Sequence, residues 1–120
     1  MARVVASEDD ARELALSLPA TSEKPSYGMP GFRVKDRLFA RIREERGVLV
    51  VWCENEAEKD FLIRAEPEKF FTTPHYDGHA MVLVRLAAVD RQELLELVTE
   101  SWRLRGPKRL VASFDAKAET

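Results

Sequence analysis

The sequence predicts an α+β fold of the two-layer sandwich type, with an antiparallel sheet and helices packed on one of its faces. Three observations predict this class. Apolar residues recur with helical spacing near both ends of the 120-residue chain, the central part alternates as strands do, and short turn motifs join the strands. Short connections favour antiparallel neighbours, because parallel strands need a long crossover. We expect one domain over residues 1–120, with a mobile tail at 115–120.

The first helix is expected to begin after Ser7. This residue can cap the helix, and Asp10, three positions later, completes an approximate capping box. Pro19 ends the helix, and the segment 21–31 that follows is turn-rich, because it contains two prolines and two glycines. One helical stripe is apolar and consists of Ala11, Leu14, Ala15 and Leu18.

An antiparallel meander is expected in the middle of the chain. Residues 32–34 begin a strand, Lys35 and Asp36 fit a tight turn, and 37–43 alternates between two faces. After a second turn, the β-branched run 48–53 suits an interior strand. On the strand 37–43 one face is expected to carry Leu38, Ala40 and Ile42, and the other Arg37, Phe39, Arg41 and Arg43.

An acidic helix is expected over residues 54–65, followed by a short helical turn or loop over 67–71. A turn over 74–78 then leads into a strand over 80–86, because an Asp-Gly pair ahead of an apolar run is typical of hairpins. The residues through which the acidic helix is expected to pack are Ala57, Phe61 and Leu62 (or Ala65).

Two helices are expected at the C-terminal end. Asp90 caps the longer one, with Glu93 at its third position, and Gly106 ends it. Pro107 begins a short helix that continues through Phe114. The buried stripe of the longer helix is expected to be Leu94, Leu97, Val98, Ser101 and Trp102.

Composition places the chain among soluble globular proteins. It is 45% hydrophobic and 33% charged, and it has no run of about 18 apolar residues, the length of a membrane span. The apolar stretch 4–6 near the N-terminus is too short for a signal peptide. The single cysteine, Cys53, cannot form an intrachain disulfide, so we expect a reducing, cytoplasmic location.

Charge is segregated along the chain. The net charge of −2 argues against a dedicated nucleic-acid binder, whose domains tend to be basic. Residues 33–46, however, hold six basic against three acidic side chains, and 103–109 hold four basic and no acidic ones. Residues 54–69 reverse the balance, with six acidic side chains against three basic. The two basic segments are therefore the candidates for contact with an anionic partner.

No catalytic site, metal or cofactor is expected. His75, Asp77 and His79 have a spacing that offers two imidazoles and a carboxylate, but only Cys53 or a remote acid could complete a metal site, and a hairpin turn also explains them. Cys53 is expected as a buried packing residue, since only those histidines are available to activate it. Neither a nucleophile elbow nor a phosphate-binding loop occurs in the sequence.

The basic meander allows two interpretations. Arginines at every second position of a strand share a face about 6.6 Å apart, close to two steps of the ~3.4 Å rise per phosphate on one DNA strand. The face therefore suits phosphate contacts, which the basic residues of 103–109 would extend. The other interpretation is a solvated face whose arginines pair with Glu44, Glu45 or the acidic helix.

Several segments together resemble the MmcQ/YjbR family. They are Gly31-Phe32-Arg33-Val34 with Leu38-Phe39-Ala40, Pro74-His75-Tyr76 with 81–86, Glu93-Leu94 through Ser101-Trp102, and 107–111. The resemblance covers most of the chain and implies a CyaY-like (frataxin-like) sandwich. It also implies DNA binding through a double wing of strand-connecting loops. The matching basic positions are Arg33, Lys35, Arg37, Arg41, Arg43, Arg46, Lys108 and Arg109.

We therefore expect a small cytoplasmic protein that binds DNA weakly, mainly through phosphates, and loses affinity steeply as salt rises. The alternative is a small-molecule or protein-interaction module without catalysis, formed around His75, Tyr76, His79 and Trp102. A cleft lined by these side chains would favour the alternative. Arginines each neutralised by a nearby carboxylate would remove the support for DNA binding. The oligomeric state stays open.

Overall fold

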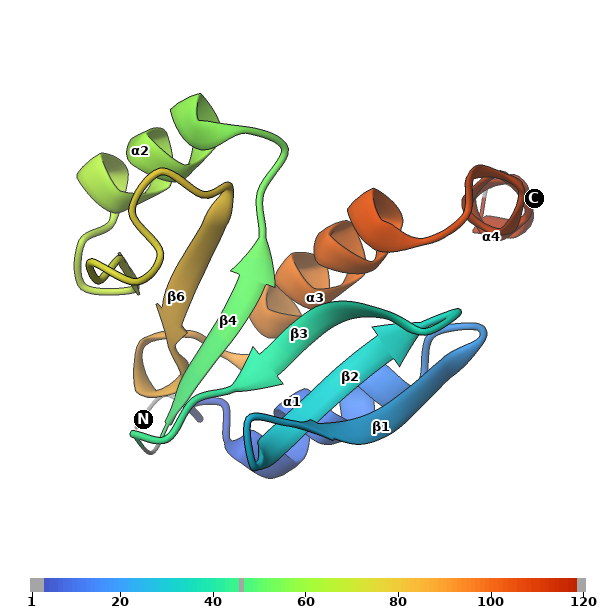
Figure 1. Ribbon diagram of the computed structural model, residues 1–120, viewed down its shortest axis with the longest axis horizontal. Helices are drawn as coiled ribbons and strands as arrows, with labels where there is room; N and C mark the ends of the chain where they lie inside the picture. The colour runs from blue at the N-terminus through green and yellow to red at the C-terminus, as the bar shows by residue number, and fades with distance from the viewer. Residues whose placement is uncertain (1–3, 46, 119–120) are drawn as a thin grey trace.

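The computed structural model describes residues 4–45 and 47–118, and within these ranges it contains a six-stranded sheet and four α-helices. The strand order across the sheet is β1-β2-β3-β4-β6-β5, and all neighbouring strands are antiparallel (Figure 1). In chain order the elements are α1 (Glu8–Leu16), β1 (Thr21–Ser26), β2 (Met29–Val34), β3 (Arg37–Ile42), β4 (Val48–Trp52), α2 (Glu56–Ala65), β5 (Phe70–Phe71), β6 (Met81–Arg85), the 3₁₀ turn η1 (Leu86–Ala88), α3 (Arg91–Arg105) and α4 (Lys108–Ala118).

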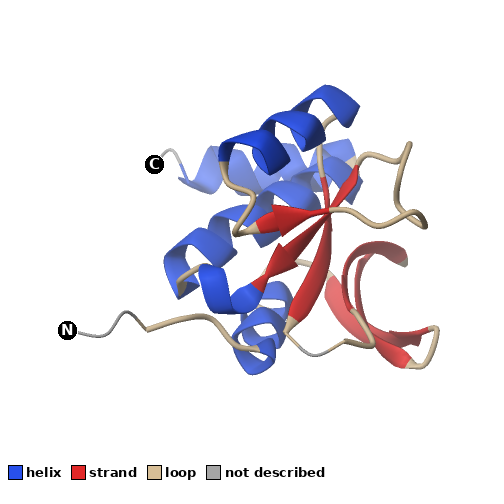
Figure 2. Ribbon diagram, turned by 90° about the vertical axis from the view of Figure 1, so that its left-hand side faces the viewer, coloured by secondary structure: helices blue, strands red, loops and turns tan. Residues whose placement is uncertain are grey.

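Helices cover one face of the sheet, which confirms the expected α+β sandwich. α1 and α3 pack against each other, and α3 also packs on β3 and β4. On this side Leu49 and Val51 of β4 share a core with Val98 and Trp102 of α3, and all four are at most 2% exposed. Figure 2 shows the helices on one side of the strands and loops on the other.

The opposite face, called the open face below, has a smaller apolar cluster of its own. Val48 and Val50 of β4 and Leu83 of β6 pack there with Tyr76, which comes from the loop between β5 and β6. This loop, residues 72–80, is called the 72–80 loop below. This part of the open face is therefore covered by a loop rather than by a helix.

A β-bulge in β3 corrects the expected alternation of the arginine-bearing strand. Phe32 pairs with Ala40 and Arg33 with Leu38, so Phe39 is an extra residue without a cross-strand partner. Phe39 consequently lies with Ala40 in the helix-side core and is fully buried. The prediction that Phe39 shares a face with the arginines is wrong, because a bulge interrupts the period of two.

The bulge also separates Arg37 from the other arginines of β3. Arg37 pairs with Val34, whose side chain belongs to the helix-side core, whereas Arg41 pairs with Val50 of the open face. Residues directly opposite in a sheet share a face. Arg41 is therefore on the open face and Arg37 is not.

Two segments form strands that the sequence did not predict. β1 pairs with β2 along its whole length through a two-residue turn, although it was expected as turn-rich. β1 is an edge strand, where Pro25 removes no hydrogen bond that the sheet needs, and most of its residues are exposed, so no alternation marks it. Phe70 and Phe71, expected in a helical turn or loop, form β5 beside β6.

The packing stripe of α2 differs from the expected one. Ala57 is exposed and Phe61 is 68% exposed, whereas Leu62 and Ile63 pack against the helix-side core. Lys59 is buried although it is charged, with 4% exposed surface. α2 packs mainly against β5 and β6 at one end of the sheet, so a narrow stripe meets the core and most of the helix is exposed.

The C-terminal helices follow the prediction closely. Asp90 accepts a hydrogen bond from the Glu93 amide at 2.8 Å and caps α3, and Gly106 ends it. α4 continues to Ala118 rather than ending at Phe114, and Asp115 pairs with Arg103 at 2.9 Å. The last two residues of the expected tail lie outside the described ranges. None of the described helices is long and apolar enough to cross a membrane.

Candidate functional site on the open face

A hollow on the open face lies where the β1–β2 turn, β3, β4 and the 72–80 loop meet. It has two adjoining compartments that share Tyr27, Arg41, His75 and Tyr76. The apolar compartment has a volume of about 210 Å³, and its other lining residues are Ser26, Leu38, Val50, Trp52 and Met81. The polar compartment has a volume of about 310 Å³, and its other lining residues are Arg43 and Glu44.

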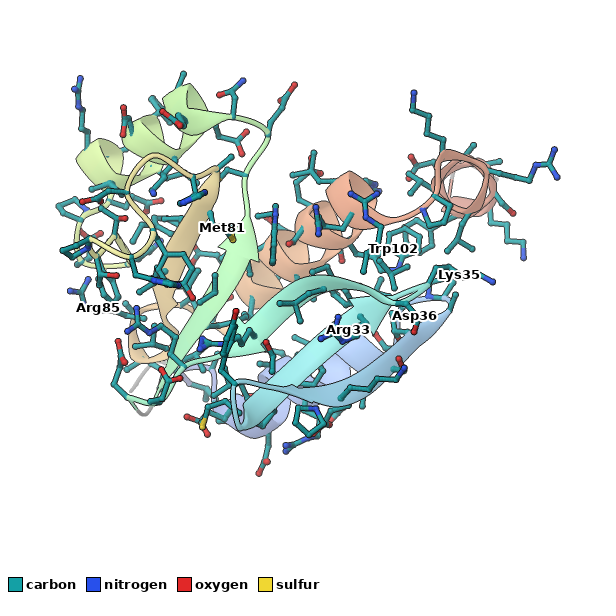
Figure 3. All side chains as sticks on the ribbon, in the orientation of Figure 1. Arg33, Lys35, Asp36, Met81, Arg85 and Trp102 are labelled. Carbon is teal, nitrogen blue, oxygen red and sulfur yellow. The ribbon has the colours of Figure 1, made fainter. Side chains whose placement is uncertain are left out.

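Strand register places neighbouring residues of the open face at and beside the hollow. Arg41, Val50 and Leu83 stand directly opposite one another on β3, β4 and β6, and Trp52 stands opposite Met81. Side chains directly opposite in a sheet lie about 4.5–5.5 Å apart, so these residues form a continuous surface. In Figure 3 the open face is toward the viewer, with Arg33 on β2 and Met81 at the start of β6.

Gly31 of β2 is required beneath this surface. It stands opposite Arg41 in the sheet. A Cβ at this position would come within 2.9 Å of the Lys24 carbonyl oxygen and 3.0 Å of Leu38 Cδ1. Such contacts are too close for any side chain, so only glycine lets β1 and Leu38 approach here.

Tyr27 forms the outer wall of the hollow from a strained position. It is the first residue of the β1–β2 turn, with a φ of 52°, and Gly28 follows with a φ of 79°. Two left-handed residues in succession are typical of the type I′ hairpin turn. The left-handed region costs about 1–2 kcal/mol for a residue with a Cβ. Despite this cost the Tyr27 side chain is not buried, since 88% of the residue is exposed to solvent.

Arg41 is the central charged group of the hollow and is 8% exposed. Its Nη2 donates to Glu44 Oε1 at 2.9 Å, its Nη1 makes a long contact of 3.4 Å to the Tyr76 hydroxyl, and its Cζ lies 5.5 Å from the centre of the Tyr27 ring. Its Nε is buried and has no hydrogen-bond partner among the described residues. A buried donor without a partner costs about 1–3 kcal/mol, and more when charged.

Arg43 and Glu44 complete the polar compartment. The Arg43 guanidinium lies 5.5 Å from the Tyr76 ring centre, and its Nε is 3.2 Å from Glu45 Oε2. The Glu44 pKa is held below its ordinary value by a hydrogen bond from its own backbone and by the charges of Arg41 and Arg43, against an opposing effect of desolvation. Glu44 is thus an ionised internal partner of both arginines.

The 72–80 loop is fixed in place by the buried lysine of α2. Lys59 Nζ donates to the Tyr76 carbonyl oxygen at 2.6 Å and to that of His79 at 3.0 Å. Within the loop the His75 and Tyr76 rings meet edge to face, with centres 4.8 Å apart. The aromatic wall of the hollow is therefore preformed by packing and hydrogen bonds.

Two further arginines lie against aromatic rings at the margins of the open face. Arg105 of α3 lies 4.6 Å from the centre of the Trp52 ring, and its Nε donates to the Leu38 carbonyl at 2.9 Å. Desolvation and the nearby charge of Arg37 lower the pKa of Arg105. Arg85 lies 4.1 Å from the Phe71 ring centre. Such cation–π contacts contribute about 0.5–1 kcal/mol each at exposed sites.

The eight basic residues predicted to contact DNA do not gather into one group. Arg33, Arg41 and Arg43 belong to the open-face side, and Arg33 Nη1 donates to the Asp36 carbonyl at 3.3 Å. Lys35 lies at the β2–β3 tip (Figure 3). Arg37 and Lys108 line a separate hollow between β3 and the α3–α4 junction, and Arg109 is exposed on α4. Arg46 lies outside the described residues.

The structure brings only two of the four residues of the predicted alternative site to the hollow. His75 and Tyr76 line the hollow, but His79 is exposed and contributes its carbonyl to Lys59. Trp102 is fully buried on the helix side, where its Nε1 donates to the Pro19 carbonyl at 3.0 Å. Tyr27 and Trp52 were not predicted as site residues from the sequence. Trp52 could have been predicted, because alternation along β4 places it on the same face as Val50.

The sequence also offered a metal candidate in the turn 75–79 and a thiol candidate in Cys53. Within residues 4–45 and 47–118 no three His, Cys, Asp or Glu side chains gather in a way that could hold a metal ion. Cys53 is buried, and desolvation, with a smaller effect of the Glu58 charge, raises its pKa to about 12. The thiol is therefore protonated at neutral pH.

The fold and the hollow define a small α+β protein with a preformed, partly charged hollow on the open face of its sheet.

The family model named YjbR matches residues 16–104. The uncharacterised proteins Mb2600 of Mycobacterium bovis and Rv2570 of Mycobacterium tuberculosis are each 34% identical over 131 residues, covering 95% of this chain and 99% of theirs. The crystal structure of Deinococcus radiodurans protein DR2400, described as a DUF419 family-model domain, is similar with a TM-score of 0.70 and 25% identity, covering 83% of this chain and 78% of that one. The chain belongs to the YjbR family, as its resemblance to MmcQ/YjbR proteins predicted.

Proposed function

We propose that the protein is a binding module that takes a small organic ligand into the open-face hollow. The observation that carries the proposal is Arg41, a nine-tenths buried arginine whose Nε has no hydrogen-bond partner among the described residues and whose guanidinium lies beside aromatic rings. Ligand sites in proteins combine apolar and aromatic walls with a few polar groups that orient the ligand. The two compartments supply these two components side by side.

Preorganisation of the walls supports the proposal. Tyr76 is held by packing on Val48, Val50 and Leu83 and by the hydrogen bonds of Lys59, so its ring needs no ordering when a ligand binds. Walls that are already ordered lower the entropic cost of association. The apolar compartment, at about 210 Å³, is smaller than the roughly 300–1,000 Å³ of pockets for drug-sized molecules. We therefore expect a small ligand or one that is partly solvated.

The proposal is tested by nuclear magnetic resonance with a library of small aromatic and aliphatic compounds. We expect some compounds to shift the Trp52 indole resonance and the backbone amides of Tyr27 and His75. At ten times its Kd a ligand adds about 1.4 kcal/mol to the free energy of unfolding, which raises Tm by about 5 °C. Trp52→Leu should abolish the amide shifts and the rise in Tm, whereas Phe61→Ala on the exposed side of α2 should not. A library that moves none of the hollow resonances would refute the proposal.

DNA binding is the second candidate, and one observation favours it. Lys35, Arg37, Lys108 and Arg109 form no ion pair among the described residues. Against it, Arg41 and Arg43 already lie within 2.9 and 3.2 Å of Glu44 and Glu45 carboxylates. If this candidate is correct, the contact surface is the β2–β3 tip with the α3–α4 junction, rather than the open face.

Titration of a DNA duplex at several salt concentrations tests the second candidate. The double variant Arg37→Glu/Lys108→Glu removes two unpaired cations and should reduce the slope of log K against log[salt] by about 1.8, at roughly 0.9 per phosphate contact. Arg64→Glu on α2 is the control, because it makes the same kind of charge reversal away from the proposed surface. Undetectable binding at low salt would exclude DNA as a partner, and equal slopes in all variants would exclude this surface as the contact.

A further inference from the structure

We propose that the ligand is a planar aromatic carboxylate, whose ring lies in the apolar compartment and whose acid group replaces Glu44 on Arg41. This inference rests on the proposed function, since it names the chemistry of the ligand for the same hollow. It is carried by the incomplete pairing of Arg41, by the division of the hollow into two compartments, and by the exposure of Glu44.

The pairing of Arg41 leaves half of a bidentate site unused. In a guanidinium group Nε and Nη2 lie on the same edge, and a carboxylate can accept from both in parallel. On this edge Glu44 accepts from Nη2 at 2.9 Å, and within the described part of the chain the adjacent Nε has no hydrogen bond. A ligand carboxylate that bound this edge with both oxygens would satisfy both donors, which Glu44 does not do.

Glu44 can leave without disturbing the fold. Its side chain is 56% exposed, in contrast to 10% for that of Arg41. It stands after the end of β3, so it can turn into solvent while the arginine stays buried. Replacement of one carboxylate by another leaves the net charge of the polar compartment unchanged. A dianion would add charge beside Glu45, which lies 3.2 Å from Arg43.

The apolar compartment fits the ring of such a ligand. Leu38, Val50 and Met81 provide aliphatic surface, and Trp52 and Tyr76 provide aromatic surface on which a planar group can lie. The methionine side chain adapts to the shape of what it contacts. A volume of about 210 Å³ limits the ring system to one ring or a fused pair. Arg41 lines both compartments, so ring and acid are bound next to each other.

The test compares 2-naphthoate, 2-naphthamide and 2-naphthyl phosphate by calorimetric titration against the full chain. We expect the carboxylate to bind at least tenfold more tightly than the neutral amide and than the phosphate. Glu44→Gln should strengthen naphthoate binding about tenfold, because one competing charged hydrogen bond is removed. Arg41→Gln should weaken it at least tenfold. Glu23→Gln is the control. It removes a carboxylate of the edge strand β1 that pairs with Arg12 of α1, and it should not change the affinity for naphthoate.

Each of the other outcomes contradicts one part of the proposal. Equal binding of naphthoate and naphthamide, or unchanged affinity in Glu44→Gln, overturns the inference and leaves the proposed function intact. Tighter binding of the phosphate identifies a phosphorylated aromatic ligand and overturns the carboxylate. If none of the three compounds binds the wild type or Glu44→Gln, the inference fails, and the compound library then decides the proposed function. Glu44→Gln keeps the test decisive if Arg41→Gln does not fold.

Discussion

Replacement of Lys59 by methionine should loosen the 72–80 loop and weaken the ligand site together. Met keeps most of the length of the side chain but donates no hydrogen bond. Lys59→Met therefore removes two contacts, to the Tyr76 carbonyl at 2.6 Å and to the His79 carbonyl at 3.0 Å. The Tyr76 carbonyl still accepts from the His79 amide at 3.1 Å, so the His79 carbonyl is the group that loses its donor.

The magnitude follows from opposing contributions. Hydrogen bonds from a charged donor contribute about 1.5–3 kcal/mol each. The buried ammonium, however, has a desolvation cost of several kcal/mol that the substitution removes. We expect a net loss of about 1–3 kcal/mol in the free energy of unfolding, which corresponds to a fall in Tm of roughly 4–10 °C. Because Tyr76 and His75 line the hollow, affinity for any hollow ligand should fall as well.

Urea denaturation and amide hydrogen exchange of Lys59→Met measure both effects. Exchange should accelerate most in the 72–80 loop, because local opening no longer breaks the two lysine hydrogen bonds. Lys24→Met is the matched control: Lys24 pairs with Asp36 at 3.1 Å, but 59% of its side chain is exposed. We expect the control to change stability by no more than about 0.5 kcal/mol. Wild-type stability and unchanged exchange in Lys59→Met would show that the loop is held by Tyr76 packing alone.

Three other predictions concern backbone strain, the thiol and acid stability. Tyr27→Asn should raise the free energy of unfolding by roughly 0.5–1 kcal/mol in urea denaturation, because Asn tolerates the left-handed region better than Tyr. The same substitution should weaken ligand binding. A loss of stability would contradict the inference that the Tyr27 backbone is strained. Cys53, with a pKa of about 12, should resist iodoacetamide at pH 8 until the protein unfolds, as mass spectrometry of alkylated samples can check. The pKa of Asp10 is lowered by hydrogen bonds from Ser7, so its contribution to stability is complete above the ordinary value near 3.8 and is lost as pH falls through the lower folded value. Asp10→Asn should therefore be less stable than the wild type at neutral pH and should flatten the loss of stability below pH 4; equal acid denaturation curves would contradict this.

Sequence periodicity was sufficient for the long helix α3 and for the interior strand β4. The cap at Asp90 and the stripe through Leu94, Val98 and Trp102 were correct because a straight helix preserves its spacing over fifteen residues. The interior strand β4 was also correct, because it is β-branched and buried on both faces. The Lys35-Asp36 turn was predicted too, and both residues have the positive φ of a tight hairpin.

Prediction failed where one residue changes the period or where tertiary contacts decide. Nothing local marks the bulge at Phe39, yet it reverses which side chains share a face with Arg41. The helical pattern of α2 selected Phe61, whereas the position of α2 at the end of the sheet buries Lys59 beneath the loop instead. The hollow itself needs residues from four separate segments, and no spacing within the sequence brings Tyr27 next to Arg41.

The pairing of charges on the open face gives the two candidate functions different expected salt dependences. A surface that binds DNA phosphates needs cations whose counterions are small ions from solution, because the phosphates replace those ions on binding. Arg41 and Arg43 do not meet this condition, since Glu44 and Glu45 already provide their counterions within the protein. A site in which an internal carboxylate can be exchanged for an external one predicts affinity that depends little on salt and strongly on Glu44. Salt dependence measured on the wild type and on Glu44→Gln therefore separates ligand exchange on the open face from phosphate binding at the β2–β3 tip.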